Sequence, residues 1–109
     1  MSASDRMFTV IYTFRVKGGQ EEAFQQSWAH ITEHYKRTRG SLGSRLHRDQ
    51  DGTFVAIALW PDRQHWEAPG PPDTPALAAA RSTMRDACEE IRTRYELEVV
   101  QDLWQRAST

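Results

Sequence analysis

The sequence predicts an α+β domain in which a four-stranded antiparallel sheet carries two long helices on one face. Three observations predict this fold. The hydrophobic period switches between two and about 3.6 along the chain, glycine or proline stands at most of the switches, and an Asp51-Gly52 pair separates two apolar runs as in a tight hairpin. A chain of 109 residues can bury one such core and leaves no room for a second domain.

The first half of the chain is predicted to form a strand, a helix and a hairpin. Apolar and polar residues alternate from Met7 to Val16, which is typical of a strand with one buried face. After Gly18-Gly19 the apolar spacing becomes four, three and four, as on one face of a helix that runs from Gln20 and ends before a left-handed cap at Gly40. The residues of that helix face are Phe24, Trp28, Ile31 and Tyr35. Strands at about 44–48 and 53–60 then form the hairpin.

The second half is predicted to contain a short helix, a stiff loop, a long helix and a last strand. The short helix lies within Pro61–Ala68, and Pro69–Pro75 forms a proline-rich surface loop. Asp73 or Thr74 can cap the next helix, with proline at its first position. Its apolar face predicts a helix that reaches about Tyr95, and Leu97–Trp104 is the expected last strand. The face consists of Leu77, Met84, Cys88, Ile91 and Tyr95.

The resulting order, β-α-β-β-α-β with one small extra helix, is the ferredoxin-like arrangement, which leaves one face of the sheet uncovered. The third strand is apolar on both of its faces, whereas a strand in a half-solvated sheet should alternate with polar residues. We therefore expect a second copy of the chain to cover the open face in a two-fold homodimer. The alternative is that loops or the chain ends cover it.

Composition excludes several classes of partner. With 14 basic and 15 acidic residues the net charge is −1, so the chain has no overall attraction for nucleic acid or an anionic membrane. Cys88 is the single cysteine, which excludes an internal disulfide and suits a reducing compartment. Residues 1–6 lack the apolar core of a signal peptide and are expected to be a loose tail on a cytoplasmic protein. We expect one domain over residues 7–105 and a C-terminal tail at 106–109.

Four local features carry a resemblance to a known family. They are the first strand running into Lys17–Phe24, the helix stop at Gly40–Arg45, Trp60 at a strand end, and Trp66 on the helical turn that follows. In these the chain resembles the antibiotic biosynthesis monooxygenase (ABM) family of dimeric α+β barrels. The resemblance implies a site that needs no cofactor, lies between sheet and helices, and oxidises electron-rich aromatic polyketides. Trp60 matches the tryptophan common at that strand end.

Such a reaction requires a general base, a donor for an oxyanion and an apolar chamber. His47 is the candidate base because imidazole titrates near neutrality, and Arg45 shares its strand face and could hold an anionic oxygen. The candidate walls of the chamber for an apolar aromatic molecule are Tyr12, Trp60, Trp66 and Met84. The alternatives are that His47 and Arg45 face solvent or a dimer interface, and that the two tryptophans are core anchors.

Other chemistries have less support. The haem-degrading branch of the same fold depends on a strand-one asparagine and a helical histidine, whereas this chain contains no asparagine and no histidine from Thr74 to Tyr95. His30 and His34 lie one turn apart, a spacing that can bind a metal, but no third ligand is implied. A non-catalytic dimer module that binds an apolar metabolite and a polyketide cyclase or isomerase are the competing functions.

Overall fold

The computed structural model describes residues 6–105 of the protein. Apart from Arg6, the tails predicted at 1–6 and 106–109 lie outside these described residues. The elements in chain order are β1 (Phe8–Val16), α1 (Glu21–Thr38), β2 (Gly43–Arg48), β3 (Phe54–Trp60), α2 (Arg63–Glu67), α3 (Pro75–Ala87) and β4 (Cys88–Glu98).

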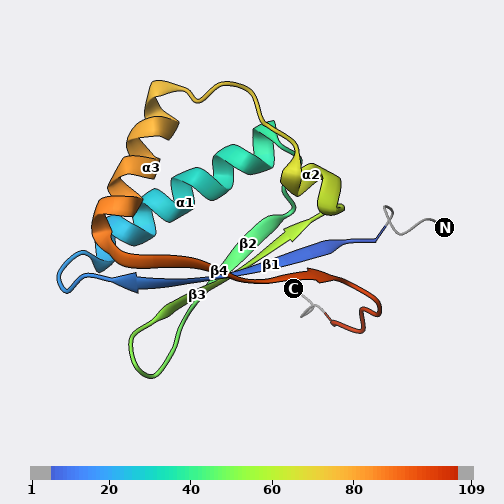
Figure 1. The fold of residues 1–109 in the computed structure, drawn as a ribbon, viewed down its shortest axis with the longest axis horizontal. Coiled ribbons are helices and arrows are strands. Elements are labelled where there is room, and N and C mark those ends of the chain that lie inside the picture. The colour runs from blue at the N-terminus through green and yellow to red at the C-terminus, as the bar shows by residue number, and fades with distance from the viewer. Residues whose placement is uncertain (1–5, 106–109) are drawn as a thin grey trace.

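The four strands form one antiparallel sheet in the order β2-β3-β1-β4. Helices α1 and α3 lie side by side on one face of this sheet, and the short α2 sits at its edge near the end of β3 (Figure 1). The predicted α+β, ferredoxin-like fold is confirmed. The predicted left-handed cap is confirmed as well, because Gly40 has a φ of 75° directly after α1.

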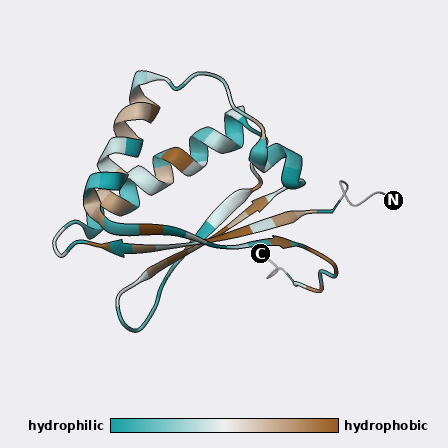
Figure 2. Ribbon diagram, viewed as in Figure 1, coloured by the Kyte–Doolittle hydropathy of each residue, from teal (hydrophilic) through white to brown (hydrophobic). Residues whose placement is uncertain are grey.

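The core lies between the sheet and the two long helices. Apolar residues recur along β1 and β3 (Figure 2), and in β1 alternate residues from Phe8 onward point toward the helices. One buried cluster joins the sheet to α1 and α3, and a second lies at the other end of β1. The first contains Phe14, Phe24, Phe54, Ala56, Ala87 and Cys88, and the second contains Phe8, Val10 and Trp60.

The predicted end of the second long helix was wrong, and so was the predicted last strand. Helix α3 ends at Ala87 and β4 begins at Cys88, so Ile91 and Tyr95 belong to a strand. Residues 91–98 in fact alternate between apolar or uncharged side chains and charged ones, which is a strand period as well as a partial helix period. Strand β4 instead pairs along the whole of β1, with Tyr95 opposite Ile11, and so provides hydrogen-bond partners for an edge of β1 that would otherwise lack them.

The other face of the sheet carries no helix. Val55, Ile57 and Leu59 point to this outer face and are only partly buried. The segment after β4 turns back beneath the sheet (Figure 1), and the Trp104 ring lies 5.1 Å from the Arg45 guanidinium carbon. The chain end thus approaches this face, yet its own apolar residues remain exposed. Val100 is 76%, Leu103 82% and Trp104 74% exposed.

Candidate functional site

Three of the predicted site residues meet on the helix side of the sheet. Tyr12 of β1 and Trp60 of β3 occupy inward positions of neighbouring strands, and Tyr12 pairs with Ala56, whose small side chain leaves room for the phenol ring. The Trp66 indole Nε1–H donates to the Tyr12 hydroxyl oxygen at 3.0 Å. The structure therefore brings Tyr12, Trp60 and Trp66 together, as one site would require.

Helix α2 places Trp66 over the sheet because its start is fixed by a cap. Asp62 accepts a hydrogen bond from the His65 backbone N–H at 2.8 Å and so caps the helix that begins at Arg63. The Trp66 ring then packs against Phe8, with ring centroids 5.5 Å apart. The His65 ring also bonds the Asp62 carboxylate, and these hydrogen bonds hold the pKa of Asp62 below its ordinary value.

Arg39, which is not among the predicted catalytic or substrate-binding residues, lies at the centre of this group. Its guanidinium carbon is 4.7 Å from the centre of the Tyr35 ring and 5.1 Å from that of the Trp60 ring. The same guanidinium donates to the backbone oxygens of Trp66 at 2.7 Å and Ala68 at 3.0 Å. Arg39 thereby joins the end of α1 to the segment that follows β3.

Arg81 of α3 is a second arginine that the sequence analysis missed. It donates to the Tyr35 hydroxyl oxygen, and its guanidinium carbon lies 5.4 Å from the centre of the Tyr35 ring. Its Nε is 3.2 Å from a carboxylate oxygen of Asp73, in the proline-rich loop. The residues that meet here are named the aromatic–arginine cluster: Tyr12, Tyr35, Arg39, Trp60, Trp66 and Arg81.

The cluster contains buried hydrogen-bond donors that lack an acceptor. Within residues 6–105, three buried side-chain nitrogen atoms make no hydrogen bond, namely Arg39 Nε, Trp60 Nε1 and Arg81 Nε. For Arg81 the nearby Asp73 oxygen provides an ion pair without hydrogen-bond alignment. Trp60 is only 3% exposed, so its indole N–H is shielded from bulk water. Buried polar groups are nearly always paired, and an unpaired one marks strain, a catalytic role, or a place for a water, an ion or a ligand.

Tyr12 adds another donor to the same place. Burial is the main cause that raises the pKa of Tyr12, and the hydrogen bond from Trp66 opposes it. The phenol is therefore protonated at neutral pH, where its oxygen accepts from Trp66 and its own O–H is left to donate. The cluster as a whole presents donors and flat rings, an arrangement that fits an aromatic molecule with acceptor oxygens.

The other predicted site residues lie elsewhere. Met84 packs against the first core cluster, which contains Phe14 and Phe24. Arg45 and His47 pair with Ile57 and Val55, so they point to the outer face of the sheet, away from the aromatic–arginine cluster. The His47 Nδ1 atom is 3.1 Å from the Val55 backbone oxygen. The catalytic roles assigned to His47 and Arg45 stay predictions.

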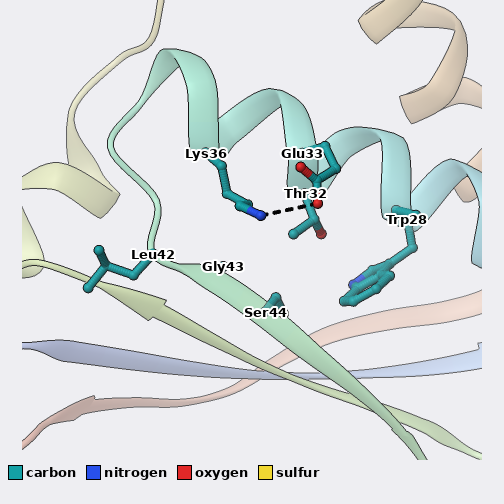
Figure 3. Close-up of a pocket in the computed structure, with 8 residues that line it drawn as sticks. Trp28, Thr32, Glu33, Lys36, Leu42, Gly43 and Ser44 are labelled. Carbon is teal, nitrogen blue, oxygen red and sulfur yellow. Dashed lines mark hydrogen bonds and ion pairs between the residues drawn. The ribbon is translucent and has the colours of Figure 1, made fainter. Parts of the chain in front are cut away.

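Two adjoining hollows run between α1 and the edge strand β2. The smaller, of about 300 Å³, has Trp28 and Lys36 over Gly43 and Ser44, with Lys36 Nζ 3.2 Å from the Glu33 carboxylate (Figure 3). The larger, of about 680 Å³, continues along β2 from Ser44 to Arg48. Neither includes a residue of the aromatic–arginine cluster.

Residues 6–105 contain neither a cluster of metal ligands nor a helix suited to crossing a membrane. In that part of the chain, no three or more histidine, cysteine, aspartate or glutamate side chains group so that they could hold a metal ion. His34 is buried and meets Tyr35 edge-on, whereas His30 is exposed. Over the same residues, none of the helices has both the length and the apolar character that crossing a membrane requires.

Known structures share this fold. A mutant form of SnoaB from Streptomyces nogalater, a cofactor-independent oxygenase, is 22% identical with a TM-score of 0.67, over 92% of this chain and 99% of that one. A protein from Bordetella bronchiseptica assigned to the antibiotic biosynthesis monooxygenases is 19% identical with a TM-score of 0.69, over 88% and 99%. One from Caulobacter crescentus is 18% identical with a TM-score of 0.67, over 90% and 93%.

At these identities the likeness concerns the fold alone. A comparison with curated proteins gave no significant match. The family model for antibiotic biosynthesis monooxygenases matches residues 7–68, which is more than half of the 109 residues and runs from β1 through α2. That match includes Tyr12, Trp60 and Trp66 and confirms the resemblance noted in the sequence. The chain belongs to the antibiotic biosynthesis monooxygenase family.

Proposed function

We propose that the protein is a cofactor-independent monooxygenase that oxidises an aromatic, quinol-like small molecule at the aromatic–arginine cluster. The observation that carries this proposal is the set of buried N–H donors without acceptors, which stand among the rings of Tyr35, Trp60 and Trp66. An aromatic ligand would stack on these rings and supply the missing acceptor oxygens.

The proposed chemistry needs no electron source other than the substrate. In an anthrone, for example, the ring CH₂ becomes a carbonyl, with one atom of O₂ in the product and the other released as water. The substrate reacts as its electron-rich oxyanion, whose proton has been released to water. Arg39 favours that ionised form by its charge, and the N–H groups of Arg39 and Trp60 can hold the oxyanion or a peroxide oxygen.

The relationship to SnoaB supports this proposal at the level of fold and family. SnoaB is described as a cofactor-independent oxygenase, and its mutant form covers 92% of this chain at 22% identity. That this chain has the same activity is our proposal, since folds of this kind host more than one chemistry.

We infer that the working form is a homodimer joined through the outer face of the sheet. Ile11, Ile57 and Leu59 lie on this face, and Leu97, which pairs with Thr9 there, is 41% exposed. A second copy would remove this apolar area from water, which favours association. A cytoplasmic location, which suits the free thiol of Cys88, is part of the same proposal.

Oxygen consumption with a panel of anthrones and naphthohydroquinones tests the function. Saturable uptake that is strongly reduced in Trp60→Phe would support a monooxygenase at this cluster, because phenylalanine keeps a ring and removes the N–H. Binding without uptake would identify a non-catalytic module instead. Product formed under strict anaerobiosis would identify a cyclase or isomerase.

A further inference from the structure

We propose that Arg39 and Arg81 make the aromatic–arginine cluster selective for aromatic molecules that carry an ionised oxygen, and that the segment Trp66–Asp73 occupies both arginines until such a molecule displaces it. This inference rests on the proposed function only in taking this cluster as the binding site. It adds the charge of the ligand and the groups with which the ligand competes.

Arg39 carries a charge that no carboxylate compensates. Within the described residues, no carboxylate oxygen lies within the 4.0 Å ion-pair distance of its guanidinium. Its partners are two neutral backbone oxygens, of Trp66 and Ala68, and two aromatic rings. A partly buried cation with only neutral partners is stabilised by an anion far more than by a neutral acceptor.

The remaining groups of the cluster favour the same ligand. Trp60 Nε1 and Arg39 Nε are donors without acceptors, and the O–H of Tyr12 is a donor that burial keeps protonated. A ligand donor would find few free acceptors here, whereas an ionised oxygen could accept from several of these groups at once. The cluster should therefore bind an aromatic anion more tightly than a neutral molecule of the same shape.

The segment Trp66–Asp73 lies against both Arg39 and Arg81 and binds them. Its backbone oxygens bind Arg39, and the Asp73 carboxylate lies 3.2 Å from Arg81 Nε. The contact is close, because a Cβ on Gly70 would lie 2.9 Å from Arg39 Cδ. Asp73 is the single anion of this segment that is paired with the cluster, so it acts as an internal competitor of an anionic ligand.

Calorimetric titration with two probes tests the proposal. The probes are 2-naphthoate and the neutral 2-naphthamide, which have the same ring system and differ in charge. The wild-type protein should bind 2-naphthoate at least roughly tenfold more tightly than 2-naphthamide, as expected for charge-assisted bonds. Arg39→Gln should lose most of that preference by weakening the naphthoate and leaving the naphthamide nearly unchanged.

A second variant should move the affinity in the opposite direction. Asp73→Asn removes the competing carboxylate and should tighten 2-naphthoate several-fold, roughly as expected for loss of one partly exposed ion pair, with no change for 2-naphthamide. Arg37→Gln, an exposed arginine in the last turn of α1, is the matched control and should behave as wild type. Circular dichroism on each variant verifies that it is folded.

The outcomes separate this inference from the proposed function. If both probes bind the wild-type protein equally and Asp73→Asn changes neither, the selection for an anion is refuted while a small-molecule site remains. If neither probe binds the wild-type protein and no anthrone supports oxygen uptake, the inference and the proposed function both fail. A preference for 2-naphthoate that survives in Arg39→Gln would refute the role of Arg39 alone.

Discussion

Replacing Trp60 by phenylalanine should harm ligand recognition far more than stability. The indole Nε1 is buried without a partner in a residue that is 3% exposed, and an unpaired buried donor costs about 1–3 kcal/mol. The smaller ring leaves a void that costs roughly 1–2 kcal/mol. These two effects oppose each other, so the free energy of unfolding should stay within about 1 kcal/mol of wild type.

Trp66→Phe is the matched comparison, because it makes the same change in size in a less buried residue. There the indole N–H is used, donating to the Tyr12 hydroxyl at 3.0 Å, so the substitution removes a bond and leaves Tyr12 short of a partner. We expect a loss of about 1–3 kcal/mol in urea denaturation. The reasoning is refuted if Trp60→Phe costs as much stability as Trp66→Phe.

The same Trp60 substitution should reduce the rate of oxygen uptake with an accepted substrate. Removing one preorganised donor to a developing oxyanion typically lowers kcat by about 10² to 10³-fold. Removing a donor that makes a weaker hydrogen bond lowers kcat roughly tenfold. Uptake that is unchanged in a folded Trp60→Phe protein would show that the unpaired N–H has no part in the reaction.

Three further changes test other parts of the structure. Ile57→Lys places a charge on the outer face of the sheet and should give a monomer in equilibrium sedimentation at micromolar protein, whereas Ser82→Lys on the exposed side of α3 should not. His47→Gln should retain oxygen uptake because the residue lies across the sheet from Trp60, and loss of uptake would support His47 as the general base. The raised pKa of Tyr12 favours the neutral phenol in the folded state, so its stabilisation is complete below about pH 10 and is lost as the pH rises through the folded pKa. Absorbance at 295 nm should therefore show a late-ionising tyrosine that Tyr12→Phe removes.

The elements that depend on local pattern were predictable from the sequence. The alternation from Met7 to Val16 and the spacing from Phe24 to Tyr35 each fit one period only, and the structure has a strand and a helix there. The region from Cys88 to Tyr95 fits two periods. Its true state was decided by pairing with β1, which lies more than 70 residues earlier in the chain, so no local rule could have chosen it.

The residues of the candidate site likewise fall into some that could be predicted from the sequence and others that could not. Tyr12, Trp60 and Trp66 were predicted because aromatic side chains are conspicuous in a sequence as possible walls of an aromatic site, and Trp60 stands at the strand end where the family resemblance expects a tryptophan. Arg39 and Arg81 were not assigned to this site, since their place in it comes from the packing of α1 against α3 and from the return of residues 66–73 over the end of α1. One local signal was present: Arg39 follows Tyr35 by four residues, which places both on the same side of the helix end.

The unpaired donors indicate that stability alone did not select this arrangement. A phenylalanine at position 60 would fill most of the same space without a buried N–H, and a carboxylate near Arg39 would pair its charge. The fold instead keeps both groups unpaired beside Tyr12, whose phenol is itself held neutral. The proposed ligand, an oxyanion on a flat ring, would supply the missing partner of each of these groups. Because such a molecule would bind the folded chain and not the unfolded one, its binding would offset the cost of leaving these donors unpaired.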